Sequence, residues 1–138
     1  MLEIIAGKRI DTFEISMSID ILLERIKDIG IENVDKKSIH QAMLVTCLPY
    51  RFWIDDDSKK ITQITVSAGY EGKFLKTIGI GSTMRDVQSI AGDYYEDEDV
   101  YKLKNHKGIC FELGDTNEDD SWDELDAPIE YISIYSEN

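Results

Sequence analysis

The chain has 138 residues, which is the usual length of one compact domain. Apolar residues make up 42% and charged residues 31% of it, and this is the balance of a globular protein rather than a disordered one. Acidic residues outnumber basic residues 28 to 15, which gives a net charge of −13. Such a surface repels phosphate backbones and anionic lipid head groups, so we expect no direct binding to nucleic acid or to membranes.

The sequence has no run of 18 apolar residues, no basic segment of the signal-peptide type and no lipidation cysteine near residue 1. These absences predict a cytoplasmic protein. The two cysteines, Cys47 and Cys110, are too few for a disulfide framework or a four-cysteine metal site. We expect both to be small buried hydrophobic residues.

An internal repeat organises the chain, because residues 7–22 align with residues 72–87 at a constant offset of 65. The identical pairs are Gly7 and Gly72, Lys8 and Lys73, Thr12 and Thr77, and Ile15 and Ile80. Similar elements are then expected in each half, which strengthens the case for a duplication.

In the first half, apolar residues at helical spacing from Ile19 to Ile26 predict a helix that is capped by Ser18 and ends near Gly30. A second helical stretch is predicted near 38–47. Two strand-like runs, 51–54 and 61–66, are joined by a turn-rich segment and predict a hairpin.

In the second half, Thr83 and Asp86 form a predicted capping box, and Gly92 is expected to end the helix. A short strand is predicted over 100–103, followed by a hairpin of strands 109–113 and 129–135. The fold class predicted from these elements is α+β. It comprises two tandem β-α-β-β repeats, about 1–68 and 69–138, within a single domain whose helices cover one face of an antiparallel sheet.

The run from Ile78 to Val87, with Gly92 five residues later, resembles the start of the helix in the β-lactamase inhibitor protein and in small outer-membrane assembly lipoproteins. The resemblance implies a curved antiparallel sheet with a short helical layer, often duplicated. It covers about fifteen residues of each half. The sequence differs from the lipoproteins in lacking a lipobox cysteine and from the inhibitor in lacking disulfide-linked cysteines, so no membrane role and no target carry over.

No catalytic constellation is recognisable, and we expect neither an enzyme nor a cofactor. The two histidines, His40 and His106, have no evident nucleophilic partner. Gly79 and Gly81 lack the third glycine or lysine of a phosphate-binding loop. Residues 115–126 place oxygens at the positions of a calcium loop but have Asp120 where glycine is required, so no metal site is predicted and weak calcium binding stays open.

Charge is concentrated between Asp93 and Asp126, where 13 acidic residues face three lysines and give a net charge of −10. Large aromatic residues accompany the two acidic runs, as they do in protein interfaces, although they could equally cover the edge of the core. The candidate partner-binding residues are Tyr94, Tyr95, Glu96, Asp97, Glu98, Asp99, Glu118, Asp119, Asp120, Trp122, Asp123 and Glu124. Trp53, within an apolar strand, is expected in the core.

These features favour a protein-binding inhibitor of the bacterial immunity-protein class, monomeric when alone. Its expected partner is a cationic protein, most plausibly a secreted nuclease toxin whose phosphate-binding site an acidic surface can cover. The alternatives are an intracellular structural or regulatory adaptor without a toxin partner and a small-molecule or metal-binding enzyme. The sequence leaves open whether the acidic loops or the open sheet face would form the interface.

Overall fold

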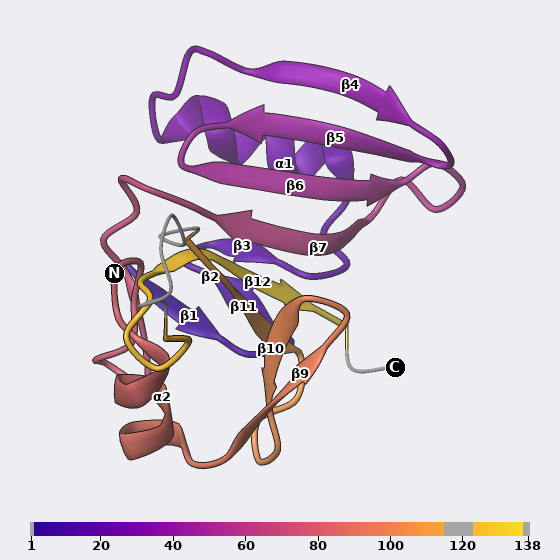
Figure 1. Cartoon of the computed structure of the whole chain (residues 1–138). Coiled ribbons are helices and arrows are strands. Elements are labelled where there is room, and N and C mark those ends of the chain that lie inside the picture. Colours follow the sequence, from indigo (N-terminus) through magenta and orange to yellow (C-terminus); the bar gives the residue numbers. More distant parts are fainter. Residues whose placement is uncertain (1, 115–122, 137–138) are drawn as a thin grey trace.

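The computed structural model describes residues 2–114 and 123–136, which form twelve strands and two helices (Figure 1). The larger of two sheets has eight strands, every neighbouring pair of which is antiparallel. Its order is β4 (Asp35–Ile39), β5 (Ala42–Cys47), β6 (Tyr50–Asp55), β7 (Ile61–Val66), β12 (Ile129–Tyr135), β11 (Ile109–Leu113), β10 (Val100–Leu103) and β9 (Tyr94–Asp97).

The smaller sheet has four short strands in the order β3 (Phe13–Glu14), β2 (Arg9–Ile10), β1 (Glu3–Ile5) and β8 (Lys73–Phe74). Strand β8 comes from the second half of the chain and pairs in parallel with β1 from the first half. The small sheet therefore links the two halves, as the pairing of β7 with β12 does in the large sheet.

Helix α1 (Ile19–Asp28) begins at Ser18, whose hydroxyl accepts a hydrogen bond from the Ile21 amide at 3.3 Å. Its buried residues, Leu22 and Ile26, belong to the same hydrophobic cluster as Phe52, and Figure 1 shows the helix behind β5 and β6. Gly30, with φ of 83°, follows the last turn in the left-handed conformation that glycine tolerates best.

Helix α2 (Met84–Ala91) has the predicted capping box. The Asp86 amide donates to the Thr83 hydroxyl at 3.2 Å, and the Thr83 amide donates to the Asp86 carboxylate at 3.0 Å. Gly92 is the C-cap, as expected. The capping residues and the terminal glycines therefore predict correctly where both helices begin and end.

The predicted fold class is wrong. The described part of the chain is mostly β, with sheets of four and eight strands and two short helices, rather than an α+β pair of β-α-β-β repeats with a helical layer. Much of the error lies in 38–47, where a helix was predicted and the hairpin of β4 and β5 occurs. Val45 and Cys47 are buried and alternate with the more exposed Leu44 and Thr46 at the spacing of a strand, and His40, with φ of 54°, lies in the two-residue turn.

The order of elements nevertheless repeats along the chain. Each half supplies one helix and then four consecutive strands that pair in sequence, and the two sets meet at β7 and β12. The predicted hairpins over 51–66 and 109–135 correspond to β6–β7 and β11–β12, and the strand predicted over 100–103 is β10. Whether the halves superpose, with Ser18 on Thr83, stays a prediction.

Candidate functional site

The first acidic run forms a hairpin at one edge of the large sheet. Strand β9 is the last strand of that sheet. Among the described strands it pairs with β10 alone, with Tyr95 opposite Lys102 and Asp97 opposite Val100. Tyr95 is 44% exposed, which is unusual for a large aromatic side chain, and Glu96 and Asp97 are exposed as well. An edge strand thus presents an aromatic ring beside carboxylates.

The tip of this hairpin is a two-residue turn formed by Glu98 and Asp99. Both residues have positive φ, 51° and 71°, which is the backbone of a type I′ turn. Asn-Gly is the usual sequence of such turns, because residues with larger side chains are strained in the left-handed region. The chain therefore holds two acidic residues at a position where they cost stability.

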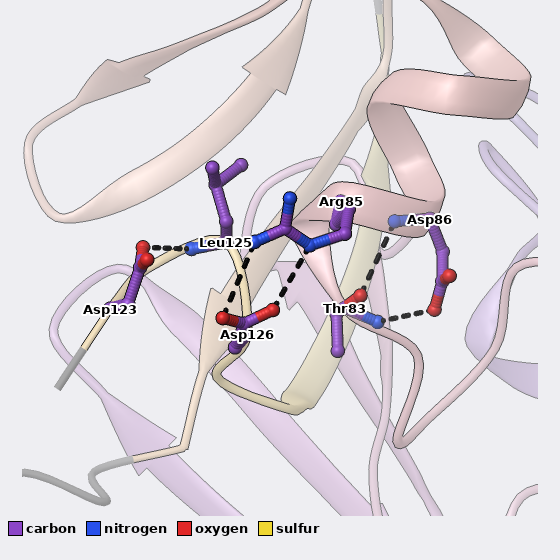
Figure 2. Close-up of polar contacts among 6 residues, drawn as sticks. All are labelled: Thr83, Arg85, Asp86, Asp123, Leu125 and Asp126. Carbon is purple, nitrogen blue, oxygen red and sulfur yellow. Dashed lines mark hydrogen bonds and ion pairs between the residues drawn. The ribbon is translucent and has the colours of Figure 1, made fainter. Parts of the chain in front are cut away.

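The second acidic run reaches the described residues only at 123–126, and it is fixed against helix α2 (Figure 2). Arg85 contacts both carboxylate oxygens of Asp126, at 3.1 Å from Nε and 3.3 Å from a terminal nitrogen. The Arg85 amide donates to the Leu125 carbonyl at 3.1 Å, and the Leu125 amide donates to the Asp123 side chain at 2.9 Å. Backbone and side-chain contacts together set the direction of this turn.

The two acidic runs are brought together by a hydrogen bond between Tyr94 and Glu124. The Tyr94 hydroxyl donates to Glu124 Oε2 at 2.7 Å, over a separation of 30 residues. Burial of the hydroxyl, and then this hydrogen bond, raise the pKa of Tyr94 to about 12. Tyr94 stays protonated at neutral pH and holds the hairpin to the 123–126 turn.

We call the residues gathered here the acidic surface: Tyr94, Tyr95, Glu96, Asp97, Glu98, Asp99, Asp123 and Glu124. Within the described ranges Lys102 pairs with Asp97 at 2.8 Å, whereas Glu96, Glu98 and Asp99 form no ion pair there. The unpaired carboxylates leave a local negative potential that a cationic partner could neutralise. The other four predicted residues, Glu118, Asp119, Asp120 and Trp122, lie outside the described residues, as does most of the segment considered for calcium.

The outward face of the large sheet is the second surface that could bind a partner. Trp53 lies on it, half-buried between the inward Phe52 and Ile54, so its predicted place in the core is wrong. The Arg51 guanidinium lies 5.6 Å from the ring centre of Tyr131, and the Thr65 and Ser133 hydroxyls lie 2.7 Å apart across the junction of the halves. Strand alternation makes this face a mixture of aromatic and polar groups, but Thr65 and Ser133 at its centre are buried, 6% and 3% exposed, so its accessible part lies on either side of them.

Part of the acidic surface lies on this outward face: Tyr95 and Asp97 point to it, whereas Tyr94 and Glu96 point to the opposite face, where the Tyr94 ring meets buried Tyr101 at 5.8 Å. Cross-strand partners run from Tyr95 through Lys102, Cys110, Ser133 and Thr65 to Arg51, so their side chains share one face of the sheet. The Lys102 ammonium also lies 5.7 Å from the ring centre of Tyr135. Cys110, Thr65 and Ser133, in the middle of this row, are buried, so a partner that covers β9 would meet only the exposed side chains at the β9 end of the row.

Sequence reasoning missed a buried polar cluster around Asp11. The Asp11 carboxylate is 7% exposed and accepts hydrogen bonds from the hydroxyls of Tyr50 at 2.6 Å and Tyr70 at 2.7 Å, and from the Glu3 amide at 2.8 Å. Its donors come from three distant segments, so no local motif marks it. Asp11 has all its hydrogen bonds satisfied and joins the small sheet to β6, which assigns it to stability rather than to chemistry.

Neither cysteine is placed for catalysis. Burial raises the pKa of Cys47 to about 11, and burial followed by the charge of Glu112 does the same for Cys110, so both thiols are protonated and unreactive at neutral pH. Among residues 2–114 and 123–136, no group of three or more His, Cys, Asp or Glu side chains could hold a metal ion. No helix of the described chain has the length and apolar character needed to cross a membrane.

Comparison with known proteins gives a fold relationship alone. No family model and no curated protein matches the chain. A solved structure, that of the uncharacterized protein yfeY from Escherichia coli, aligns with a TM-score of 0.56 over 95% of this chain and 98% of that chain. The two sequences are 13% identical, so the likeness is one of fold and carries no activity.

Proposed function

We propose that this protein is a protein-binding inhibitor of the immunity-protein kind, which neutralises a cationic, nuclease-type toxin by covering its active site. The observation that carries the proposal is the acidic surface, where two runs far apart in the sequence are held together by Tyr94 and Glu124. A nuclease concentrates lysine and arginine to attract phosphate, and a fixed array of carboxylates can occupy the same site.

Two features of the acidic surface support binding rather than solubility alone. Glu98 and Asp99 occupy a turn in which Asn-Gly would be more stable, and strained residues of this kind are enriched at functional sites. Tyr95 exposes an aromatic ring beside the unpaired carboxylates, and exposed tyrosines surrounded by polar groups are typical anchors of interfaces.

The alternative is an intracellular adaptor without a toxin partner, and the position of β9 favours it. Exposed edge strands invite pairing with other chains, and charged side chains on such strands are a common protection against aggregation. If that is the whole role of the acidic residues, their reversal would affect solubility and leave any partner's binding kinetics unchanged.

The first test is the neighbouring gene, which we expect to encode a secreted protein with a cationic toxin domain. That domain is then co-expressed with the chain, and binding of the purified pair is followed by surface plasmon resonance. We expect the wild-type chain to protect the cells, and association to slow steeply as salt rises, because exposed charges are screened beyond about 8 Å at physiological ionic strength. The double variant Glu96→Lys, Glu98→Lys should bind more slowly and protect less.

The matched control is the double variant Glu24→Lys, Glu32→Lys, which changes the net charge equally at exposed positions of the first half. It should retain the wild-type association rate. Tyr95→Ala should instead speed dissociation, with a loss of about 2 kcal/mol in binding if the ring is an anchor. Unchanged kinetics in the acidic-surface variant, together with full protection, would refute the proposal and leave the adaptor.

A further inference from the structure

A hollow of about 660 Å³ lies where β1, β8 and the turn between β10 and β11 meet. Buried Ile4 and Phe74 line it from the core, and Leu2 and Leu75 are 52% and 40% exposed beside it. Its size falls in the range of small-molecule sites, roughly 300–1,000 Å³. None of its lining residues belongs to the acidic surface.

The hollow is basic in a protein that is strongly acidic. Four lysines line it, and they are Lys8, Lys73, Lys76 and Lys107. No ion pair joins any of them to another described residue. The acidic residue in the lining is Glu3, which is already paired with Arg9. The Lys73 ammonium lies against Gly79, outside the lining, so Lys8, Lys76 and Lys107 supply the local positive charge at the hollow.

The turn after β8 places one apolar and one cationic side chain at this hollow at a cost in backbone strain. Leu75 and Lys76 have φ of 52° and 67°, so two consecutive side-chain-bearing residues occupy the left-handed region. Such conformations cost about 1 kcal/mol or more each and persist where the surrounding structure imposes them. On the other side, the His106 ring meets the Phe74 ring edge-on at 5.5 Å and helps to form the wall.

We propose that this hollow binds an amphiphilic anion, a small molecule with an anionic head and an apolar chain, of which a medium-chain carboxylate is the simplest form. The lysine ammonium groups would hold the head, and Leu2, Phe74 and Leu75 would cover the chain. A bare phosphate leaves the exposed leucines without a role, and an uncharged lipid leaves the lysines without one. The site is independent of the proposed inhibitor function, since neither its residues nor its ligand involve the acidic surface.

Isothermal titration calorimetry and amide NMR shifts of the full chain test the proposal, with decanoate as the probe at neutral pH and below its micellar concentration. We expect saturable binding of decanoate, with shifts centred on residues 2–8, 73–76 and 105–107. Decanol, which lacks the charge, and inorganic phosphate, which lacks the chain, should each bind at least about tenfold more weakly. Equal binding of decanol or phosphate, tighter binding of a blocked tetraglutamate peptide, or no saturable binding of decanoate would overturn the proposal.

Two variants test separately the binding of the ligand's anionic head and of its apolar chain. The double variant Lys76→Glu, Lys107→Glu should weaken decanoate binding about tenfold, whereas Lys37→Glu, Lys60→Glu, with the same change of charge at exposed sites of the first half, should leave it unchanged. Leu75→Asn removes apolar surface while keeping a residue that tolerates the left-handed backbone, and it should also weaken decanoate binding. If the control pair weakens binding as much as the lysines of the hollow do, the effect is one of net charge and the site is refuted.

Discussion

At the scale of single residues, Asp11 combines burial, positive φ and several hydrogen bonds in one side chain. It lies in a turn with φ of 56° and accepts from Tyr50, Tyr70 and the Glu3 amide. Asp11→Asn keeps the tolerance for this backbone but replaces an acceptor oxygen with an amino group. We expect a loss of about 2 kcal/mol in the free energy of unfolding, because a buried hydroxyl loses its acceptor.

Urea denaturation measures this loss, and Asp57→Asn, at an exposed position, is the control with little expected effect. The loss should be coupled to the tyrosine: Tyr50→Phe should cost less when it is combined with Asp11→Asn than when it is made in the wild type. If the cost of the double variant equals the sum of the two single costs, the hydrogen bond between these residues contributes nothing and the stability of this region rests on apolar packing.

The same cluster predicts a loss of stability in alkaline solution. Burial, and then the hydrogen bond to Asp11, raise the pKa of Tyr50 and of Tyr70 above the ordinary tyrosine value. The folded state therefore holds these protons more tightly than the unfolded state, so their stabilisation is complete below about pH 10 and is lost as the pH rises above it. Unfolding free energies measured at about pH 8 and pH 11 should differ, and the difference should shrink in Tyr70→Phe. A pH-independent free energy over that interval would contradict the raised pKa values.

At the scale of elements, substitutions in the β9–β10 turn test whether its residues reduce stability and contribute to partner binding. Replacing Glu98 and Asp99 by Asn and Gly puts residues that tolerate positive φ into the turn. We expect the free energy of unfolding to rise by about 0.5–1 kcal/mol, which a higher Tm in thermal unfolding would show. If the acidic surface binds a cationic partner, the same change should slow association with it. A variant that is more stable and binds equally well would indicate that the turn residues have no part in recognition.

The helices, whose capping residues lie next to them in the sequence, were predicted well. The hairpin of β4 and β5, which depends on pairing with other strands, was not. Ser18, Thr83 and Asp86 mark helix starts through hydrogen bonds to amides three residues away, so the residues that make the cap are visible in the sequence. The apolar run in 38–47 is compatible with the period of a helix and with that of a strand. The segment forms strands because β5 pairs with β4 and with β6. Pairing partners lie far away in the sequence, and local propensity cannot specify them.

The candidate site divides in the same way. The acidic runs were recognisable from composition, but their meeting through Tyr94 and Glu124 depends on the placement of β9 and of the turn beside α2. Trp53 was predicted in the core because its neighbours are apolar, whereas strand alternation places it on the outward face. Asp11 gave no signal, since its partners come from three separate segments.

At the scale of the whole molecule, the two halves share one core. One hydrophobic cluster includes buried residues from both halves, such as Phe52 and Phe111, and strands β7 and β12 join them in the middle of the large sheet. Parallel pairing of β1 with β8 and a 3.0 Å hydrogen bond from the Gly7 amide to the Gly108 carbonyl add a second junction. Neither half has a separate set of buried residues that would let it unfold alone, so we expect one cooperative transition.

Gly108 tests this cooperativity, because its junction is too close for a side chain. A Cβ there would lie 2.6 Å from the Gly7 backbone, and φ is 85°. Gly30 has nearly the same φ, 83°, but open space around it, so Gly30→Ala measures backbone strain alone, about 1 kcal/mol. Calorimetry should therefore give a single transition for both variants, with a larger drop in Tm for Gly108→Ala than for Gly30→Ala. Two separated transitions in Gly108→Ala would instead mean that the halves fold independently, because loss of their junction would then uncouple them without unfolding either.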